Sequence, residues 1–121
     1  MFRTDLYVQI GVNRVRVRNV DGGANVERLS KVPFSHPRML VGNFTEAQAL
    51  VKAAVAEAKG SSFFRTLRIV MHPTEVVSGG LAQVEDRVFR ELALGAGAAK
   101  VVVWVGIELG DEAVKAKLVG N

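Results

Sequence analysis

Three neighbouring carboxylates form the densest group of residues that could do chemistry in this sequence. Glu108, Asp111 and Glu112 follow the apolar run 101–105, which predicts a strand, so they lie near its carboxyl end. Open α/β sheets place their sites at that end, and carboxylates there could ligate a metal or transfer protons. Acidic residues in the first turn of a helix also stabilise the helix dipole. We favour this structural role over a catalytic one.

Histidine, serine and cysteine give little support for catalysis. His36 and His72 each stand beside a proline, without a neighbouring ligand or nucleophile in the sequence, so we interpret both as structural. Ser61 and Ser62 lack the Gly-x-Ser-x-Gly context of a hydrolase nucleophile. The sequence contains no cysteine, which excludes disulfides, thiolate zinc sites, iron–sulfur clusters and cysteine nucleophiles.

Arg14, Arg16 and Arg18 form the one concentrated set of positive charges. They alternate with Val15 and Val17, which is typical of a strand with one face in water. Such a stripe could bind phosphate groups or an acidic protein surface. Charges on an edge strand, which prevent aggregation, would give the same pattern, and we favour that interpretation. The formal net charge of +4 favours acidic partners without requiring them.

Length and composition indicate one ordered domain, 1–121. Hydrophobic residues make up 49% of the chain and charged residues 23%, which is typical of a globular protein. The first residues do not combine a basic segment with an apolar stretch, and no run approaches the roughly 20 apolar residues of a membrane span. We therefore expect a cytoplasmic protein without a membrane span.

Strand signals dominate the first third of the chain. Residues 6–10 form an apolar run that ends at Gly11, as expected for a central strand. The Asp-Gly-Gly sequence at 21–23 tolerates positive φ, so residues 14–20 and 25–34 should pair as a hairpin. These three strands place the arginine stripe beside the central strand.

Two longer helices are expected in the middle of the chain. Thr45, with Gln48 three positions later, forms a capping-box pattern, and the helix that it begins should stop at Gly60. A second apolar stripe begins at Leu81 and ends in the Gly-Ala-Gly sequence at 95–97. Both helices carry one apolar face, so each must pack against a sheet.

The remaining elements complete an alternating pattern. Residues 67–71 and 101–105 are short apolar strands, and the second contains no polar residue, which predicts burial on both faces. Asp111 is a candidate N-cap for a short last helix. The order β-β-β-α-β-α-β-α predicts an α/β fold with a five-stranded mixed sheet flanked by helices, the arrangement of ribonuclease-H-like and actin-like folds.

Several segments resemble the bacterial actin family of MreB, in the same order and over nearly the whole chain. Residues 6–11, Leu-Tyr-Val-Gln-Ile-Gly, resemble the opening strand and the start of the phosphate loop. Residues 41–47 resemble the family's Ile-Ala-Asp-Phe and Thr-Glu-Ala. The longest match comprises Pro73, Gly79, Gln83-Val84-Glu85, Arg87 and Gly95-Ala96-Gly97-Ala98. The chain is thus similar to the first, IA-like subdomain of the family.

This resemblance implies a subdomain that has lost the residues of the family's ATPase. An acidic residue in the first strand of the family helps to position magnesium, and Gln9 stands in its place. The family's Glu-Glu-Pro falls on residues 105–107, Val-Gly-Ile, so Glu108 is the nearest carboxylate that could act as a base. Gly11 and Asn13 would remain from the phosphate loop as vestigial cofactor-binding residues.

We therefore expect a non-catalytic MreB-like domain without a resident cofactor or metal, acting through protein contacts in cell shape, filament regulation or envelope assembly. Its candidate partner-binding residues are Arg14, Arg16 and Arg18. A vestigial ATP and magnesium site at Gly11, Asn13 and Glu108 is one alternative. A ribonuclease-H-like module that binds nucleic acid through the arginine stripe is another, and we disfavour it. The chain could also be a piece of a longer polypeptide.

Overall fold

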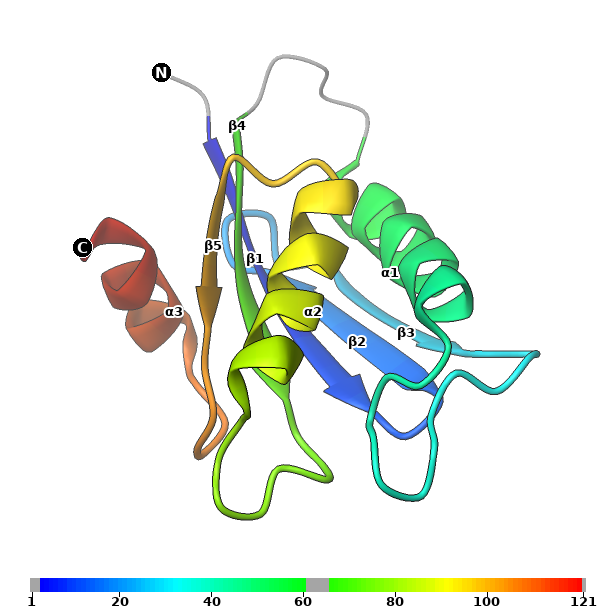
Figure 1. Ribbon diagram of the computed structural model, residues 1–121. Coiled ribbons are helices and arrows are strands. Elements are labelled where there is room, and N and C mark those ends of the chain that lie inside the picture. The colour runs from blue at the N-terminus through cyan, green and yellow to red at the C-terminus, as the bar shows by residue number, and fades with distance from the viewer. Residues whose placement is uncertain (1–2, 61–65, 121) are drawn as a thin grey trace.

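The computed structural model describes residues 3–60 and 66–120, so Ser61 and Ser62 lie outside the described residues. Eight elements follow one another in the predicted order β-β-β-α-β-α-β-α (Figure 1). They are β1 (Arg3–Gly11), β2 (Arg14–Asn19), β3 (Asn25–Leu29), α1 (Phe44–Lys59), β4 (Thr66–Pro73), α2 (Gln83–Gly95), β5 (Lys100–Val103) and α3 (Asp111–Val119).

The strands form one mixed sheet in the order β3-β2-β1-β4-β5. The hairpin pairs β1–β2 and β2–β3 are antiparallel, whereas β1–β4 and β4–β5 are parallel because a helix crosses between their ends. The five-stranded mixed sheet predicted from the sequence is therefore confirmed. Central β1 ends at Gly11, which pairs with Arg14 across a two-residue turn.

The helices lie on opposite faces of this sheet (Figure 1). α1 and α2 cover one face, where β-branched residues of the strands and the alanines of α1 form the main core. α3 packs on the other face against β1, β4 and β5. Its smaller core contains Tyr7, Val70, Leu109, Val114 and Leu118. Hydrophobic burial on both faces fixes the strand register, since a one-residue slip would turn every side chain over.

A buried ion-pair network ties α3 to the sheet. The Asp5 side chain is fully buried in β1 and accepts two hydrogen bonds from the Arg68 guanidinium, at 2.7 and 2.8 Å. Lys115 of α3 donates to Asp5 at 3.0 Å and also pairs with Asp21. Burial raises the pKa of Asp5, but the bonds and charges of Arg68 and Lys115 outweigh it and hold the pKa below its ordinary value.

Two predicted boundaries in the first half of the chain are wrong. β3 ends at Leu29, not at residue 34, because its partner strand β2 begins at Arg14, which pairs with Leu29. α1 begins at Phe44 with Asn43 as its N-cap, so Thr45 lies inside the first turn and caps nothing. The Phe34 carbonyl accepts from the amides of residues 42 and 43, which fixes the entry of the helix.

Two further predictions fail near the carboxyl terminus. Gly110, not Asp111, is the N-cap of α3. The strand expected to be buried on both faces, β5, is half-buried along its whole length. It lies at an edge of the sheet, and α3 leaves part of one face uncovered. Among the described residues, no helix is both long and apolar enough to cross a bilayer.

Candidate functional site at the open half of the sheet

The face of the sheet that carries α3 is only half covered. α3 packs on β1, β4 and β5, and no described helix packs on β2 or β3 from this side. The uncovered half contains two adjoining hollows of about 220 and 380 Å³. We call them together the polar trough. Its lining includes Gln9, Gly11, Arg14, Arg16, Arg18, Asn25, Glu27, Thr74 and Glu108.

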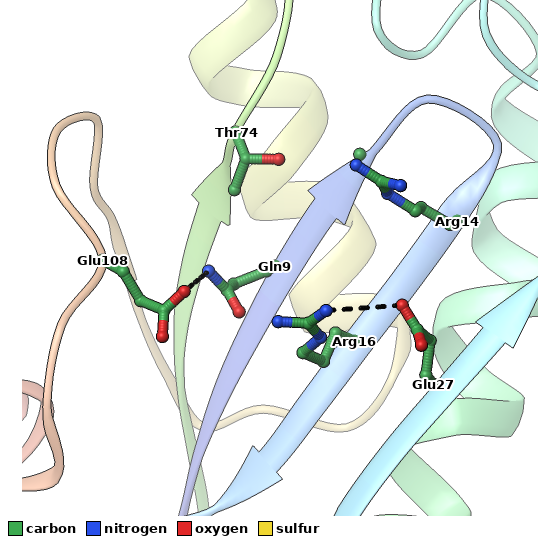
Figure 2. Close-up of a pocket in the computed structure, with 7 residues that line it drawn as sticks. Gln9, Arg14, Arg16, Glu27, Thr74 and Glu108 are labelled. Carbon is green, nitrogen blue, oxygen red and sulfur yellow. Dashed lines mark hydrogen bonds and ion pairs between the residues drawn. The ribbon is translucent and has the colours of Figure 1, made fainter.

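Gln9 and Glu108 meet at the side of the trough next to α3. Gln9 is near the end of central β1, and Glu108 comes from the segment between β5 and α3 (Figure 2). The Gln9 amide donates a hydrogen bond to the Glu108 carboxylate at 3.3 Å. A neutral amide is a weak ligand for a hard cation, and the described part of the chain contains no group of three or more His, Asp or Glu side chains able to hold a metal.

The three carboxylates singled out in the sequence do not converge on one point. Glu108 contacts Gln9. Asp111 forms an ion pair with Arg18 at 2.8 Å. Glu112 is exposed on the first turn of α3, where its charge favours the helix dipole.

Glu75, which sequence reasoning missed, contacts the β1–β2 turn next to the trough. Its Oε2 accepts hydrogen bonds from the Val12 amide at 2.7 Å and from Arg14 Nη2 at 3.2 Å. A Cβ on Gly11 would lie 2.8 Å from the same oxygen, so a larger residue there would push this carboxylate aside. Pairing of β1 with β4 brings Glu75 here, and no motif in the sequence signals that pairing.

All three arginines of the stripe have carboxylate partners within the chain. Arg14 pairs with Glu75 at 3.2 Å, and Arg16 faces Glu27 across the β2–β3 ladder at 3.5 Å (Figure 2). Arg18, besides its Asp111 pair, donates to the Leu109 carbonyl at 2.6 Å. β2 lies between β1 and β3, so the interpretation of the stripe as edge-strand protection is wrong.

Asn13 lies outside the trough and has a structural task. It adopts a positive φ of 54° in the turn after β1. Its Oδ1 accepts hydrogen bonds from the amides of Phe34 and Ser35, both at 2.8 Å. Of the two residues expected from a phosphate loop, Gly11 thus lines the trough and Asn13 does not.

Buried His72 supports the segment that carries Glu108. Its Nε2 donates to the Gly106 carbonyl at 3.0 Å, so Nδ1 is the acceptor for the Tyr7 hydroxyl at 2.5 Å. The Tyr7 oxygen in turn accepts from the Leu109 amide at 3.1 Å. Burial lowers the pKa of His72 and raises the pKa of Tyr7, so both side chains are neutral at pH 7.

Fold and site together define an α/β protein with a five-stranded mixed sheet and a charge-paired trough on its open half. No family model matches the sequence. The chain is 31% identical over 97 residues to the "Uncharacterized protein YjaA" of Escherichia coli (strain K12), and the match covers 75% of each chain. The chain belongs to the family of YjaA.

Proposed function

We propose that this chain is a non-catalytic, MreB-like actin-fold domain that acts through protein–protein contacts. The strand order β3-β2-β1-β4-β5, with its antiparallel hairpins and parallel crossovers, supports the ribonuclease-H-like and actin-like class that the element order predicts. One observation carries the proposal: each arginine of the trough is paired with a carboxylate of the same chain. In the resemblance to MreB, Gln9 stands in the place of that family's acidic residue, and it donates to Glu108.

Magnesium and a triphosphate would need features that the trough lacks. A hard cation prefers carboxylate oxygens, but Gln9 offers an amide and Glu108 already accepts from it. Phosphate oxygens need free donors, whereas Glu75 takes both the Val12 amide and Arg14. A triphosphate would have to displace a carboxylate of the protein itself.

The same surface suits a protein partner. The side chains of Arg14, Arg16 and Glu27 are each about half exposed, so they can contact a second molecule without leaving their own pairs. Mixed charges of this kind give specificity, because a wrong partner meets like charges. An actin-like filament or an envelope assembly protein is the partner that we propose, in cell shape or filament regulation.

A charge exchange between β2 and β3 tests this proposal. The double variant Arg16→Glu with Glu27→Arg keeps the intramolecular pair but reverses the charges that a partner meets. We expect an unchanged unfolding curve and at least tenfold weaker capture of the partner isolated with the wild-type protein from its host. Equal capture by both proteins would exclude the trough as the contact surface. Failure to isolate any specific partner would refute the protein-contact role.

The vestigial nucleotide site is a second candidate, because the Val12 amide and Arg14 both donate to one anionic group. In this structure that group is the Glu75 carboxylate. Calorimetric titration with ATP and magnesium separates the two candidates. We expect no micromolar binding by the wild-type chain. The variant Glu75→Ala frees the same donors and serves as the matched control. Micromolar, magnesium-dependent binding by the wild-type chain would refute the non-catalytic assignment.

Nucleic-acid binding is weaker as a candidate since each arginine of the stripe already has a carboxylate partner. Salt-dependent retention on DNA or RNA that is lost on Arg16→Glu would favour it. We expect no such retention.

A further inference from the structure

The two edges of the sheet differ in their protection. β3 presents exposed Asn25, Glu27 and Arg28 along its edge, and such charges discourage strand pairing. β5 consists of Lys100 followed by three valines, all half-buried, and β4 is its one neighbour in the described sheet. Its outer backbone groups are therefore available to an added strand.

A groove runs beside β5 on the face that carries α3. It has a volume of about 630 Å³ and is lined mainly by apolar atoms of Val102, Trp104, Ile107, Ala113, Ala116 and Lys117. The Ile107 residue is 81% exposed. The Trp104 indole donates to the Ile107 carbonyl at 2.8 Å, which holds the ring at the groove. We call this surface the β5 groove.

Two lysines, Lys100 and Lys117, border the β5 groove. Lys117 Nζ lies 3.9 Å from the centre of the Trp104 ring, and Lys100 Nζ donates to the carbonyls of Leu118 and Gly120 at 2.7 and 2.8 Å. Within residues 3–60 and 66–120, neither lysine has a carboxylate within ion-pair distance. The trough arginines, in contrast, are all paired.

We propose that β5 and the β5 groove bind an extended acidic segment of a partner protein. The segment adds a strand beside β5. Because alternate side chains of a strand point to one face, it sets an apolar side chain against Trp104 and Ile107 and a carboxylate next to Lys117. A second copy of this chain fits less well, since its own β5 offers lysine and valine and no carboxylate.

This inference rests on the proposed protein-contact role and adds a second surface to it. Arg90 of α2 donates to the Val101 carbonyl at 3.3 Å. The backbone groups of β5 that bond neither to β4 nor to Arg90 are those that the incoming strand would use. Trp104 is the single tryptophan of the sequence, so its fluorescence reports on this groove alone.

A peptide titration tests the proposal without knowledge of the native partner. The ligand is a short synthetic peptide that repeats Glu-Glu-Val-Val, so that glutamate and valine alternate along each face of the strand. It is labelled for anisotropy and also titrated unlabelled against Trp104 fluorescence. We expect saturable binding that shifts the emission of Trp104. A peptide that repeats Lys-Lys-Val-Val is expected not to bind, and an N-methylated acidic peptide, which cannot pair as a strand, should bind at least tenfold more weakly.

Substitutions at two residues that line the groove localise the binding. Lys117→Glu and Ile107→Asp should each weaken binding of the acidic peptide about tenfold, as expected for loss of one ion pair or one apolar anchor. Both positions lie at the surface, and the unfolding curve of each variant checks that the fold is retained. Lys52→Glu, at an exposed lysine of α1 on the opposite face of the sheet, is the matched control and should leave the peptide affinity unchanged.

Several outcomes would overturn the proposal: no saturable signal, equal binding of the basic peptide, or unchanged affinity of both groove variants. A wild-type dimer that Ile107→Asp dissociates would assign the groove to a second copy instead. Failure of the protein-contact role is recognised separately, through the charge exchange in the trough and the ATP titration, because neither involves the β5 groove.

Discussion

The polar trough and the β5 groove lie on the same side of one sheet, separated by α3 and the segment that leads into it. In the trough, Arg14, Arg16 and Arg18 each have a carboxylate of the same chain. At the groove, Lys100 and Lys117 contact carbonyls and an aromatic ring. The pairing of a charged side chain within the chain, more than its residue type, therefore decides whether it can bind a charged group of a partner.

The contacts that a partner must replace explain why pairing has this effect. An exposed ion pair contributes little to stability, but a partner that separates it must replace both contacts. A lysine over an indole ring keeps its charge available, because the ring contributes no counter-ion. The groove should therefore attract carboxylates more strongly than the trough, although the trough contains more cationic side chains.

The largest expected effect comes from detaching α3, which would merge the two surfaces. Asp5→Ala removes the carboxylate that compensates Arg68 and Lys115, and a buried charge left alone is strongly destabilising. We expect a loss of about 3–5 kcal/mol in the free energy of unfolding, measured by urea denaturation. Arg16→Ala, which breaks an exposed pair, is the control and should cost about 0–1 kcal/mol. Equal losses would contradict the anchoring role of Asp5.

A smaller effect is expected from loosening the segment between β5 and α3. Tyr7→Phe leaves His72 Nδ1 without its donor and the Leu109 amide without its acceptor. Each buried group without a partner costs about 1–3 kcal/mol, so thermal unfolding should shift to lower temperature. Amide exchange at residues 106–109 should accelerate more than exchange in α1. Uniform acceleration would indicate that the segment has no separate anchor.

The same anchor predicts a dependence of stability on pH. Because burial lowers the pKa of His72 in the folded state, the unfolded chain binds more protons below the ordinary value of 6.5. Stability should therefore fall as the pH decreases from about 6.5 through the folded pKa. His72→Gln should flatten this part of the curve. The pKa of Asp5 is also lowered in the folded state, so its protonation reduces stability only at more acidic pH, around and below its ordinary value of 3.8.

The smallest effect is expected from Gly11→Ala, which should disturb the Val12–Glu75 hydrogen bond beside the trough and leave the β5 groove unchanged. Gly11→Ala places a Cβ 2.6 Å from Arg14 Nε and 2.8 Å from Glu75 Oε2, both ends of flexible side chains that can move away. We expect a cost below about 1 kcal/mol, since the disturbed pair is exposed. The amide resonance of Val12 should shift while Trp104 fluorescence stays constant. A change at Trp104 would show that the two surfaces are coupled.

Element type and order followed from local patterns in the sequence. The alternation of valine with arginine in β2 and the apolar run of β1 marked strands, because side-chain period and residue type act over a few neighbours. Boundaries were less secure. Thr45 carries a capping pattern, but the Phe34 carbonyl fixes the start of α1 from ten residues away.

The sequence by itself thus determined the eight elements, the wet face of β2 and the absence of cysteine chemistry. Only the tertiary structure decided which charges are neutralised. Glu75 reaches Arg14 across 61 positions, and Asp111 reaches Arg18 from another element. Such pairs depend on strand order and helix packing, for which no local pattern carries a signal. Among the described residues, Lys100 and Lys117 of the β5 groove have no carboxylate partner for the same reason, because α3 packs where it leaves them at an open edge.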